Sequence, residues 1–220
     1  RRRPRLARGA GVAAGAGGFF LFTQKGQEIL NIPYRKSKKA EKKDPEQSSE
    51  PVFINQGPAP ELTGLTKWYH SEPQTLAALQ GKVVLVNFWT YSCRNCIDFI
   101  PYLNKWHEQY KDQGLVVLGI HTPEFKFENV PGNIEPAILR HKINYPVALD
   151  PSYKTWSAWG NQFWPAVYLV DKNGEVVYTH FGDGQYVQTE KAIRLLLGLE
   201  GEFKAPPIAE QSTGKTPTIY

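Results

Sequence analysis

Cysteine is scarce in this sequence of 220 residues, in which Cys93 and Cys96 are the only two. Small secreted scaffolds held together by disulfides need more pairs than this, so that class of protein is excluded. The hydrophobic residues, 41% of the total, suffice for a sizeable core, and the length allows one domain with additional segments. The two cysteines therefore act as a pair within a domain that folds around its core.

A second set of metal-ligating residues is also missing. Structural zinc takes four ligands, and the two cysteines supply only half of them. The histidines show no HxxxH spacing; they are His70, His107, His121, His141 and His180. The pattern favours a redox pair over a metal site, with a non-catalytic metal-binding module and two inert buried cysteines as alternatives.

The main part of the chain has no excess of positive charge, although the net charge is +5. Residues 1–50 contain 12 Lys and Arg against 5 Asp and Glu, whereas residues 51–220 contain 14 against 16. The basic character therefore belongs to the N-terminal arm, and it does not indicate nucleic-acid binding.

The N-terminal arm has the order of a secretory signal. Five arginines precede an uncharged run from Gly9 to Thr23, which is at the short end for a membrane span. No Ala-x-Ala-like cleavage site follows Phe22, so residues 1–23 are predicted to form an uncleaved membrane anchor rather than a cleaved signal. The arginines would then stay cytoplasmic and the rest of the chain would lie outside. A disordered Gly/Ala arm is the alternative.

Two further segments are too polar or too irregular to fold by themselves. Residues 24–50 are rich in Lys, Glu, Ser and Gln and are predicted to be a charged flexible linker. Residues 201–220 contain several prolines and no helical period, which predicts an irregular tail. The folded domain is therefore expected over residues 51–200.

Within that domain, predicted strands alternate with predicted helices. Apolar runs indicate strands at 82–89, 115–121 and 145–150, and helical spacing follows Cys96 as far as Tyr110. Asp150 is expected to be the N-cap of a helix that ends at Gly160, and Asn173-Gly174 is expected to be the turn of a hairpin that precedes a helix over 186–197. This order predicts an α/β domain with a mixed central sheet flanked by helices.

The cysteine pair lies where the first of these strands passes into its helix. The free N–H groups and the positive dipole end of a helix N-terminus stabilise a thiolate there. The spacing of three residues places Cys96 on the same helical face as Cys93. One sulfur can therefore attack a substrate disulfide, and the other can resolve the mixed disulfide that results.

Several separated motifs resemble one known family. The stretch VNFWTYSCRNC, followed by Pro101, resembles the thioredoxin fold, and the segment inserted after the second strand resembles its membrane-anchored TlpA/ResA-like branch. The stretches GPAPELTGL, GIHTPEF, YPVALD, WPAVYLVD and YTHFGDG are similar to the DipZ-type group of that branch. The resemblance implies a thioredoxin fold with an insertion after the second strand of its βαβ unit. It also implies a thiol–disulfide oxidoreductase.

The same resemblance assigns roles to individual residues. Cys93 would be the exposed nucleophile and Cys96 the resolving thiol, and their redox-active disulfide would make any further cofactor or metal unnecessary. Trp164-Pro165 matches the cis-proline of the family, whose preceding backbone pairs with the substrate chain. The remaining assignments are substrate contacts for Arg94 and Asn95 and supporting positions for Trp89, Asn87 and Pro101, with a helix kink expected at Pro101.

Two departures from the family concern an acidic residue. Thioredoxins have a buried Asp where this chain has Asn87, and ResA-like proteins have a Glu where it has Phe99. Asp98 is adjacent, but one residue corresponds to about 100° of helix rotation, so its side chain is expected to point elsewhere. Resolution of the mixed disulfide is expected to rely on water or on Asp98 in an altered geometry. His121 is a candidate for the cleft or for ordinary packing.

The resemblance also implies partners and a location. Protein thiols and disulfides would be the substrates, a membrane protein would donate electrons, and the N-terminus would hold the domain at a membrane. The location would be extracytoplasmic, in the bacterial periplasm or cell envelope, for a membrane-anchored or a secreted protein. A thiol peroxidase is the alternative function, because Thr90-x-x-Cys93 matches part of the peroxiredoxin motif, although Val86 replaces the proline of that motif.

Overall fold

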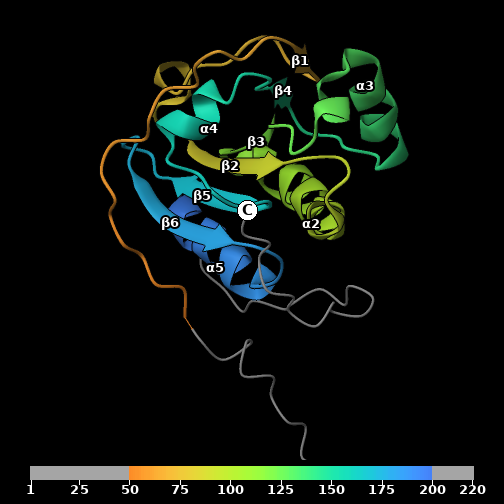
Figure 1. Ribbon diagram of the computed structural model, residues 1–220. Coiled ribbons are helices and arrows are strands. Elements are labelled where there is room, and N and C mark those ends of the chain that lie inside the picture. The colour runs from red at the N-terminus through yellow and green to blue at the C-terminus, as the bar shows by residue number, and fades with distance from the viewer. Residues whose placement is uncertain (1–49, 200–220) are drawn as a thin grey trace, which may run out of the picture. The chain divides into compact units, whose positions relative to one another are not determined.

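The computed structural model describes residues 50–199 (Figure 1). The predicted anchor, nearly all of the predicted linker and the predicted tail lie outside these residues. Within residues 50–199, no helix combines the length and the apolar character that a membrane span requires.

The described chain forms one mixed sheet of six strands in the order β1-β4-β3-β2-β5-β6 (Figure 1). Strand β2 pairs in parallel with β3, and β3 pairs in parallel with β4, whereas β5 is antiparallel to both β2 and β6. The short β1 pairs antiparallel with β4. The strand bounds are Trp68–Tyr69 for β1, Val83–Trp89 for β2, Leu115–His121 for β3, Val147–Leu149 for β4, Ala166–Val170 for β5 and Val176–Phe181 for β6. The predicted mixed α/β architecture is confirmed.

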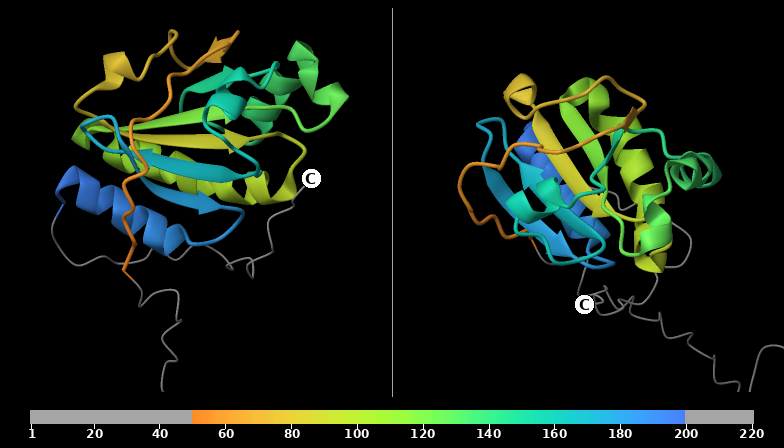
Figure 2. Two further views of the ribbon diagram at one scale, coloured as in Figure 1. Left: turned by 60° about the vertical axis from the view of Figure 1, so that its left-hand side comes forward. Right: turned by 45° about the horizontal axis from the view of Figure 1, so that its top comes forward.

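Helices and one long segment cover the two faces of this sheet (Figure 2). The helices are α2 at Arg94–Tyr110, α3 at Pro131–Arg140, α4 at Lys154–Ala158 and α5 at Tyr186–Leu197, with short 3-10 turns η1 at Ala77–Leu79, η2 at Lys111–Gln113 and η3 at Lys126–Asn129. Alternate residues of β2 separate the two cores, because successive side chains of a strand point to opposite faces. Val83, Leu85 and Trp89 pack with α2 and α5, while Phe88 packs with Trp156 and Trp159 and with the segment that precedes β2.

The helix predicted to begin at Asp150 begins later. Tyr153 is the N-cap of α4, and Lys154 is its first residue. Asp150 remains tied to the sheet, because its N–H donates to the carbonyl of His121 at 2.9 Å. Its carboxylate nevertheless accepts bonds from the N–H groups of Lys154 and Trp156, each at 2.8 Å, so the side chain caps the helix from a distance.

The predicted insertion lies between β3 and β4. It contains η3 and α3 and begins with the residues that follow His121. The first part of this insertion comes beside the start of α2, because β2 and β3 are parallel neighbours and both end at the same edge of the sheet. This edge is where the two cysteines lie.

Candidate active site

The two cysteines lie at the start of α2, immediately after the central strand β2. Cys93 is the N-cap residue, and its Sγ accepts a hydrogen bond from the N–H of Cys96 at 3.4 Å. Cys93 is half-buried, whereas Cys96 is only 1% exposed. Both are free thiols in this structure. The predicted arrangement, with an outer sulfur and an inner sulfur on one helical face, is the one observed.

The environment separates the acidities of the two thiols. A hydrogen bond from the Cys96 side chain, helped by the N–H groups of Cys96 and Asn95, lowers the pKa of Cys93 in spite of its partial burial. Burial is the main cause of the opposite shift at Cys96, and the neighbouring Cys93 sulfur adds to it, so the pKa of Cys96 lies well above its ordinary value. Cys93 is therefore the stronger nucleophile at neutral pH, because the thiolate is the reactive form.

The loop before β5 forms the wall opposite Cys93. The Trp164-Pro165 peptide bond is cis, as the sequence predicted. The carbonyl oxygen of Trp164 lies 3.9 Å from the Sγ of Cys93. The indole N–H of Trp164 donates to the carbonyl of Thr122 at 3.0 Å, and its ring packs against Trp156 with centroids 4.0 Å apart. The wall is thereby held against both the insertion and α4.

A cleft of about 230 Å³ lies between these elements. The residues that line it are Ser92, Cys93, Arg94, Asn95, Glu124, Phe125 and Trp164. The structure thus brings Arg94, Asn95 and Trp164 together at Cys93, as predicted, and adds two residues of the insertion that the sequence did not single out. Phe125 is 47% exposed and stacks on Phe127, with 5.5 Å between the ring centroids. One side of the cleft is therefore aromatic.

Comparison with known proteins gives matches of different extent. The model of the AhpC/TSA family matches residues 56–179. DipZ of Mycobacterium tuberculosis is 48% identical over 144 residues, which cover 64% of this chain and 21% of DipZ. The thiol-disulfide oxidoreductase YkuV of Bacillus subtilis is 31% identical over 140 residues, which cover 64% of this chain and 94% of YkuV.

The chain belongs to the AhpC/TSA family. A solution structure of a thioredoxin-like protein in the oxidised form matches it with a TM-score of 0.59 at 31% identity, covering 66% of this chain and 97% of that one. The predicted thioredoxin fold and the predicted relationship to the DipZ and ResA proteins are confirmed. The matched region spans about a fifth of the length of DipZ.

Asn87 and Phe99 stand at the two positions where an acidic residue was expected, and both are buried. Asn87 is buried and donates a hydrogen bond from its Nδ2 to the carbonyl of Ala166 at 3.2 Å. Phe99 lies on the buried face of α2, in the core. Asp98 is held by Arg94 through bonds of 3.0 Å and 2.9 Å. Asp98 is thus engaged along the helix surface, and a role for it in an altered geometry stays a prediction.

Arg94 was expected to touch substrate. Its side chain is 77% exposed and is paired with Asp98, one helical turn further on. The lowered pKa of Cys93 comes from the Cys96 side chain and from backbone N–H groups. A contact between Arg94 and substrate stays a prediction.

Two of the supporting residues, Trp89 and Pro101, and the candidate His121 lie in different environments. Trp89 is fully buried at the end of β2 and packs edge-on against His121. Pro101 lies inside the continuous helix α2, where it has no N–H to donate to the carbonyl of Ile97. The expected kink at Pro101 stays a prediction. The predicted alternatives for His121 resolve in favour of packing, because it is 1% exposed and stacks against Tyr91.

The sequence reasoning missed Glu128, a fully buried carboxylate behind the cleft. Its Oε1 accepts bonds from the hydroxyl of Thr90 at 2.5 Å, the hydroxyl of Ser92 at 2.6 Å and the N–H of Ser92 at 3.3 Å. Its Oε2 accepts bonds from the N–H groups of Glu124 at 2.5 Å and Phe125 at 2.8 Å. One carboxylate thus joins the loop that precedes Cys93 to the loop on the other side of the cleft.

The hydrogen bonds to Glu128 also determine its charge. Burial alone raises the pKa of a carboxyl group, but the bonds from Ser92, Thr90 and the backbone outweigh burial and hold the pKa of Glu128 below its ordinary value. Glu128 is therefore ionised at neutral pH. Glu128 is the third residue of η3, but Phe125 stands at the N-cap where a capping box has Ser or Thr, so the sequence offered no capping signal for it.

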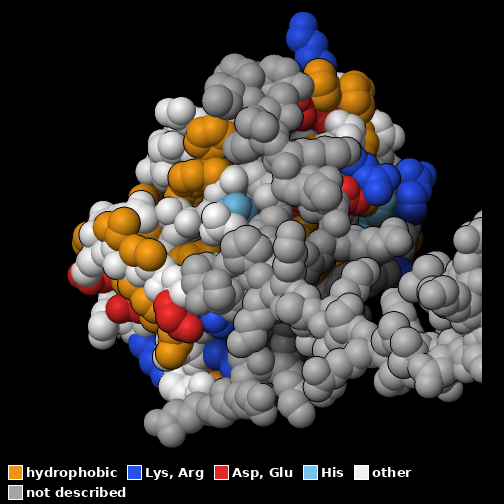
Figure 3. Space-filling model, turned by 90° about the horizontal axis from the view of Figure 1, so that it is seen from below, with side chains coloured by type: hydrophobic (Ala, Val, Ile, Leu, Met, Phe, Trp, Pro, Cys, Tyr) orange, Lys and Arg blue, Asp and Glu red, His pale blue; other side chains and the backbone are white. Residues whose placement is uncertain are grey.

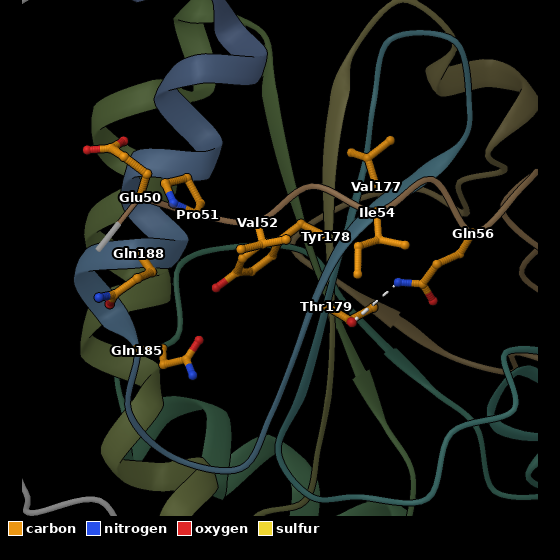
Figure 4. Close-up of a pocket in the computed structure, with 10 residues that line it drawn as sticks. All are labelled: Glu50, Pro51, Val52, Ile54, Gln56, Val177, Tyr178, Thr179, Gln185 and Gln188. Carbon is orange, nitrogen blue, oxygen red and sulfur yellow. Dashed lines mark hydrogen bonds between the residues drawn. The ribbon is translucent and has the colours of Figure 1, made fainter. Parts of the chain in front are cut away.

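Three further features of the described residues concern metal binding, a second cavity and surface charge. No group of three His, Cys, Asp or Glu among residues 50–199 is arranged to hold a metal ion. A second cavity, of about 500 Å³, lies between residues 50–56, β6 and the start of α5, and it shares no lining residue with the cleft (Figure 4). On the face seen from below, the visible basic and acidic side chains are interspersed (Figure 3).

Proposed function

We propose that this domain is a thiol–disulfide oxidoreductase that exchanges disulfides with protein substrates through Cys93 and Cys96. The observation that carries the proposal is the contrast between the two sulfurs. Cys93 is accessible from the cleft, and its thiol has a lowered pKa. Cys96 is buried beneath Cys93, and its thiol has a raised pKa. The family relative YkuV, which this chain matches over 94% of its length, is named for the same activity.

The chemistry follows from these positions. The thiolate of Cys93 attacks one sulfur of a substrate disulfide, and the first substrate thiol leaves. Cys96 then attacks the Cys93 sulfur of the mixed disulfide, so that the second substrate thiol leaves and a Cys93–Cys96 disulfide forms. Two electrons pass from the dithiol to the substrate, and the reverse sequence oxidises a substrate dithiol.

The wall at Trp164-Pro165 is the proposed substrate contact. The carbonyl of Trp164 faces Cys93, so an extended substrate segment can pair with this backbone while its sulfur meets Cys93. Arg94 and Asn95 line the same cleft and would contact the segment from the side of α2.

The location and the further partners belong to the same proposal. The domain would be extracytoplasmic, either held at the membrane of the cell envelope by residues 1–23 or secreted, and a membrane protein would reduce it. The five arginines and the uncharged run that follows them support the extracytoplasmic location. The disulfide of the cysteine pair would be the only redox group. Fractionation of cells that produce the full chain tests the anchor, because a soluble mature protein that begins after Phe22 would contradict it.

The activity is tested with reduced full-length protein and insulin. We expect insulin reduction by the wild type and its loss in both Cys93→Ser and Cys96→Ser. The thiol peroxidase alternative predicts peroxide consumption that depends on Cys93 and on the free hydroxyl of Thr90. That hydroxyl is fully buried and donates to Glu128, which favours disulfide exchange. Insulin reduction that persists without either cysteine would contradict the proposal.

A further inference from the structure

The resolving step of the proposed function needs a proton acceptor. Cys96 is 1% exposed and its thiol has a pKa well above the ordinary value, so very little of it is ionised at neutral pH. The thiolate is the form that attacks a disulfide. The buried neighbours Asn87 and Phe99 carry no acidic group, so the acceptor must come from elsewhere.

Three carboxylates lie near the cysteine pair. Asp98 is bonded twice to Arg94 on the helix surface. Glu128 is fully buried and accepts five hydrogen bonds from the two loops. Glu124 differs from both, because it is half-buried and lines the cleft together with Cys93. Of the described residues that line this cleft, it is the one that carries a carboxylate.

The backbone of Glu124 is fixed on both sides. On one side, its N–H donates to Glu128 Oε2 at 2.5 Å and the hydroxyl of Tyr153 donates to the carbonyl of Pro123. On the other side, the N–H of Phe125 donates to the same Oε2 at 2.8 Å. The Oε1 of the same Glu128 holds Ser92, which precedes Cys93. Glu124 is therefore placed on the wall of the cleft by the same contacts that place Cys93.

The charge of Glu124 is close enough to act on both sulfurs. It raises the pKa of Cys93 and the pKa of Cys96, although other groups contribute more to each shift. The charged or titratable groups near it include Arg94 from α2, Glu128 from η3 and Tyr153 beside α4. Glu128 has a lowered pKa and the pKa of Tyr153 is raised, so neither changes its charge near neutral pH.

We propose that Glu124 accepts the proton of Cys96, through water in the cleft, when Cys96 resolves the mixed disulfide. The S–H bond of Cys96 breaks and an O–H bond forms on Glu124. The Cys96 sulfur bonds to Cys93, and the bond between Cys93 and the substrate sulfur breaks. The electron pair of that bond leaves with the substrate thiolate, which takes up a proton from Glu124 or from water. The cleft, at about 230 Å³, has room for such a water.

A single-turnover reaction with one equivalent of 2,2′-dithiodipyridine separates the two steps. The first pyridine-2-thione is released when Cys93 attacks, and the second is released when Cys96 resolves the mixed disulfide. We expect the first release in Glu124→Gln to be at least as fast as in the wild type, because loss of the negative charge favours the Cys93 thiolate. We expect the second release to be slower by about 100-fold, in the range of general-base catalysis.

The pH profile identifies the role of the carboxylate. In the wild type, the rate of the second release should be level once Glu124 is ionised. In Glu124→Gln it should rise with pH until Cys96 itself ionises. Glu124→Asp should recover part of the rate. Asp112→Asn removes an exposed carboxylate in η2, beyond the far end of α2 and outside the cleft, and both of its releases should match the wild type.

The outcomes distinguish this inference, which rests on the proposed function, from that function. A second release in Glu124→Gln at the wild-type rate would overturn the role of Glu124, as would equal slowing of both releases or equal slowing in Asp112→Asn. A wild type that releases only one thione and forms no Cys93–Cys96 disulfide would instead overturn the disulfide exchange itself.

Discussion

Replacing Glu128 by glutamine tests the buried carboxylate that joins the two loops of the active site. The side chain keeps its size, but one oxygen becomes an NH₂ group. The N–H groups of Glu124 and Phe125 cannot rotate away, so we expect the remaining oxygen to face them. The NH₂ group then faces Ser92 and Thr90, whose hydroxyls can turn and accept.

One donor is left without an acceptor by this change. The N–H of Ser92, 3.3 Å from Oε1 in the wild type, would face the NH₂ group. A fully buried donor without a partner costs about 1–3 kcal/mol, and the cost here is at the low end because Ser92 is exposed. The remaining bonds also lose the strength that the charge gave them. Removal of a buried charge offsets part of this loss. We expect Glu128→Gln to lower the free energy of unfolding by about 2–4 kcal/mol at pH 7.

The dependence on pH follows from the lowered pKa of Glu128. A carboxyl whose pKa is lower in the folded state stabilises the fold above its ordinary pKa, near 4.5, and this stabilisation is lost as the pH falls through the lowered value. The difference in stability between wild type and variant should therefore be largest near neutral pH and should shrink in acid.

Urea unfolding followed by tryptophan fluorescence measures this difference. Glu190→Gln is the matched control, because Glu190 is also buried but accepts a bond from the hydroxyl of Tyr110, which an amide oxygen can still accept. We expect a loss of less than about 1 kcal/mol in that control. Equal stability of wild type and Glu128→Gln at pH 7, or a difference that grows in acid, would refute the reasoning.

Four further predictions concern single residues. Iodoacetamide should label Cys93 before Cys96 in the reduced protein at pH 7, and mass spectrometry showing the reverse order would contradict the assignment of the nucleophile. Cys96→Ser should leave a long-lived mixed disulfide on Cys93, which a non-reducing gel detects. The ring of His121, whose pKa burial lowers to about 4, should stay neutral between pH 5 and 8, so an NMR titration with a midpoint near 6.5 would be inconsistent with its packing. Gly119→Ala would place a Cβ 2.9 Å from the ring of Tyr145, and thermal unfolding should show a loss of about 1–3 kcal/mol.

The sequence predicted the central part of the fold because local signals agree there. The run predicted as a strand over 82–89 is observed as the fully buried β2, Val83–Trp89, in which Asn87 is the one polar residue. The helix over 186–197 has the predicted bounds. The predicted start of the helix at Asp150 was wrong, because a backbone hydrogen bond to His121 keeps Asp150 at the edge of the sheet. The two-residue strand β1 has no periodicity from which it can be predicted.

The cysteine side of the site was predictable for a different reason. The spacing of Cys93 and Cys96 and the strand that precedes them fix their relation within one local segment. Glu124 and Glu128 come about 30 residues later, in a segment of mixed polarity with no strand or long helix of its own. Their approach to Cys93 results from the parallel pairing of β2 with β3, which a local pattern does not contain.

The loop that carries Glu124 also carries the aromatic side of the cleft, and this links proton transfer to substrate contact. An acid at the position of Asn87 or Phe99, both of which are buried, would not line the cleft. Glu124 is instead followed directly by Phe125, which is exposed and stacks on Phe127. A substrate that packs on these rings touches the segment whose N–H groups are bonded to Glu128. Glu128 therefore holds both the aromatic side of the cleft and Glu124, the carboxylate proposed to accept the proton of Cys96.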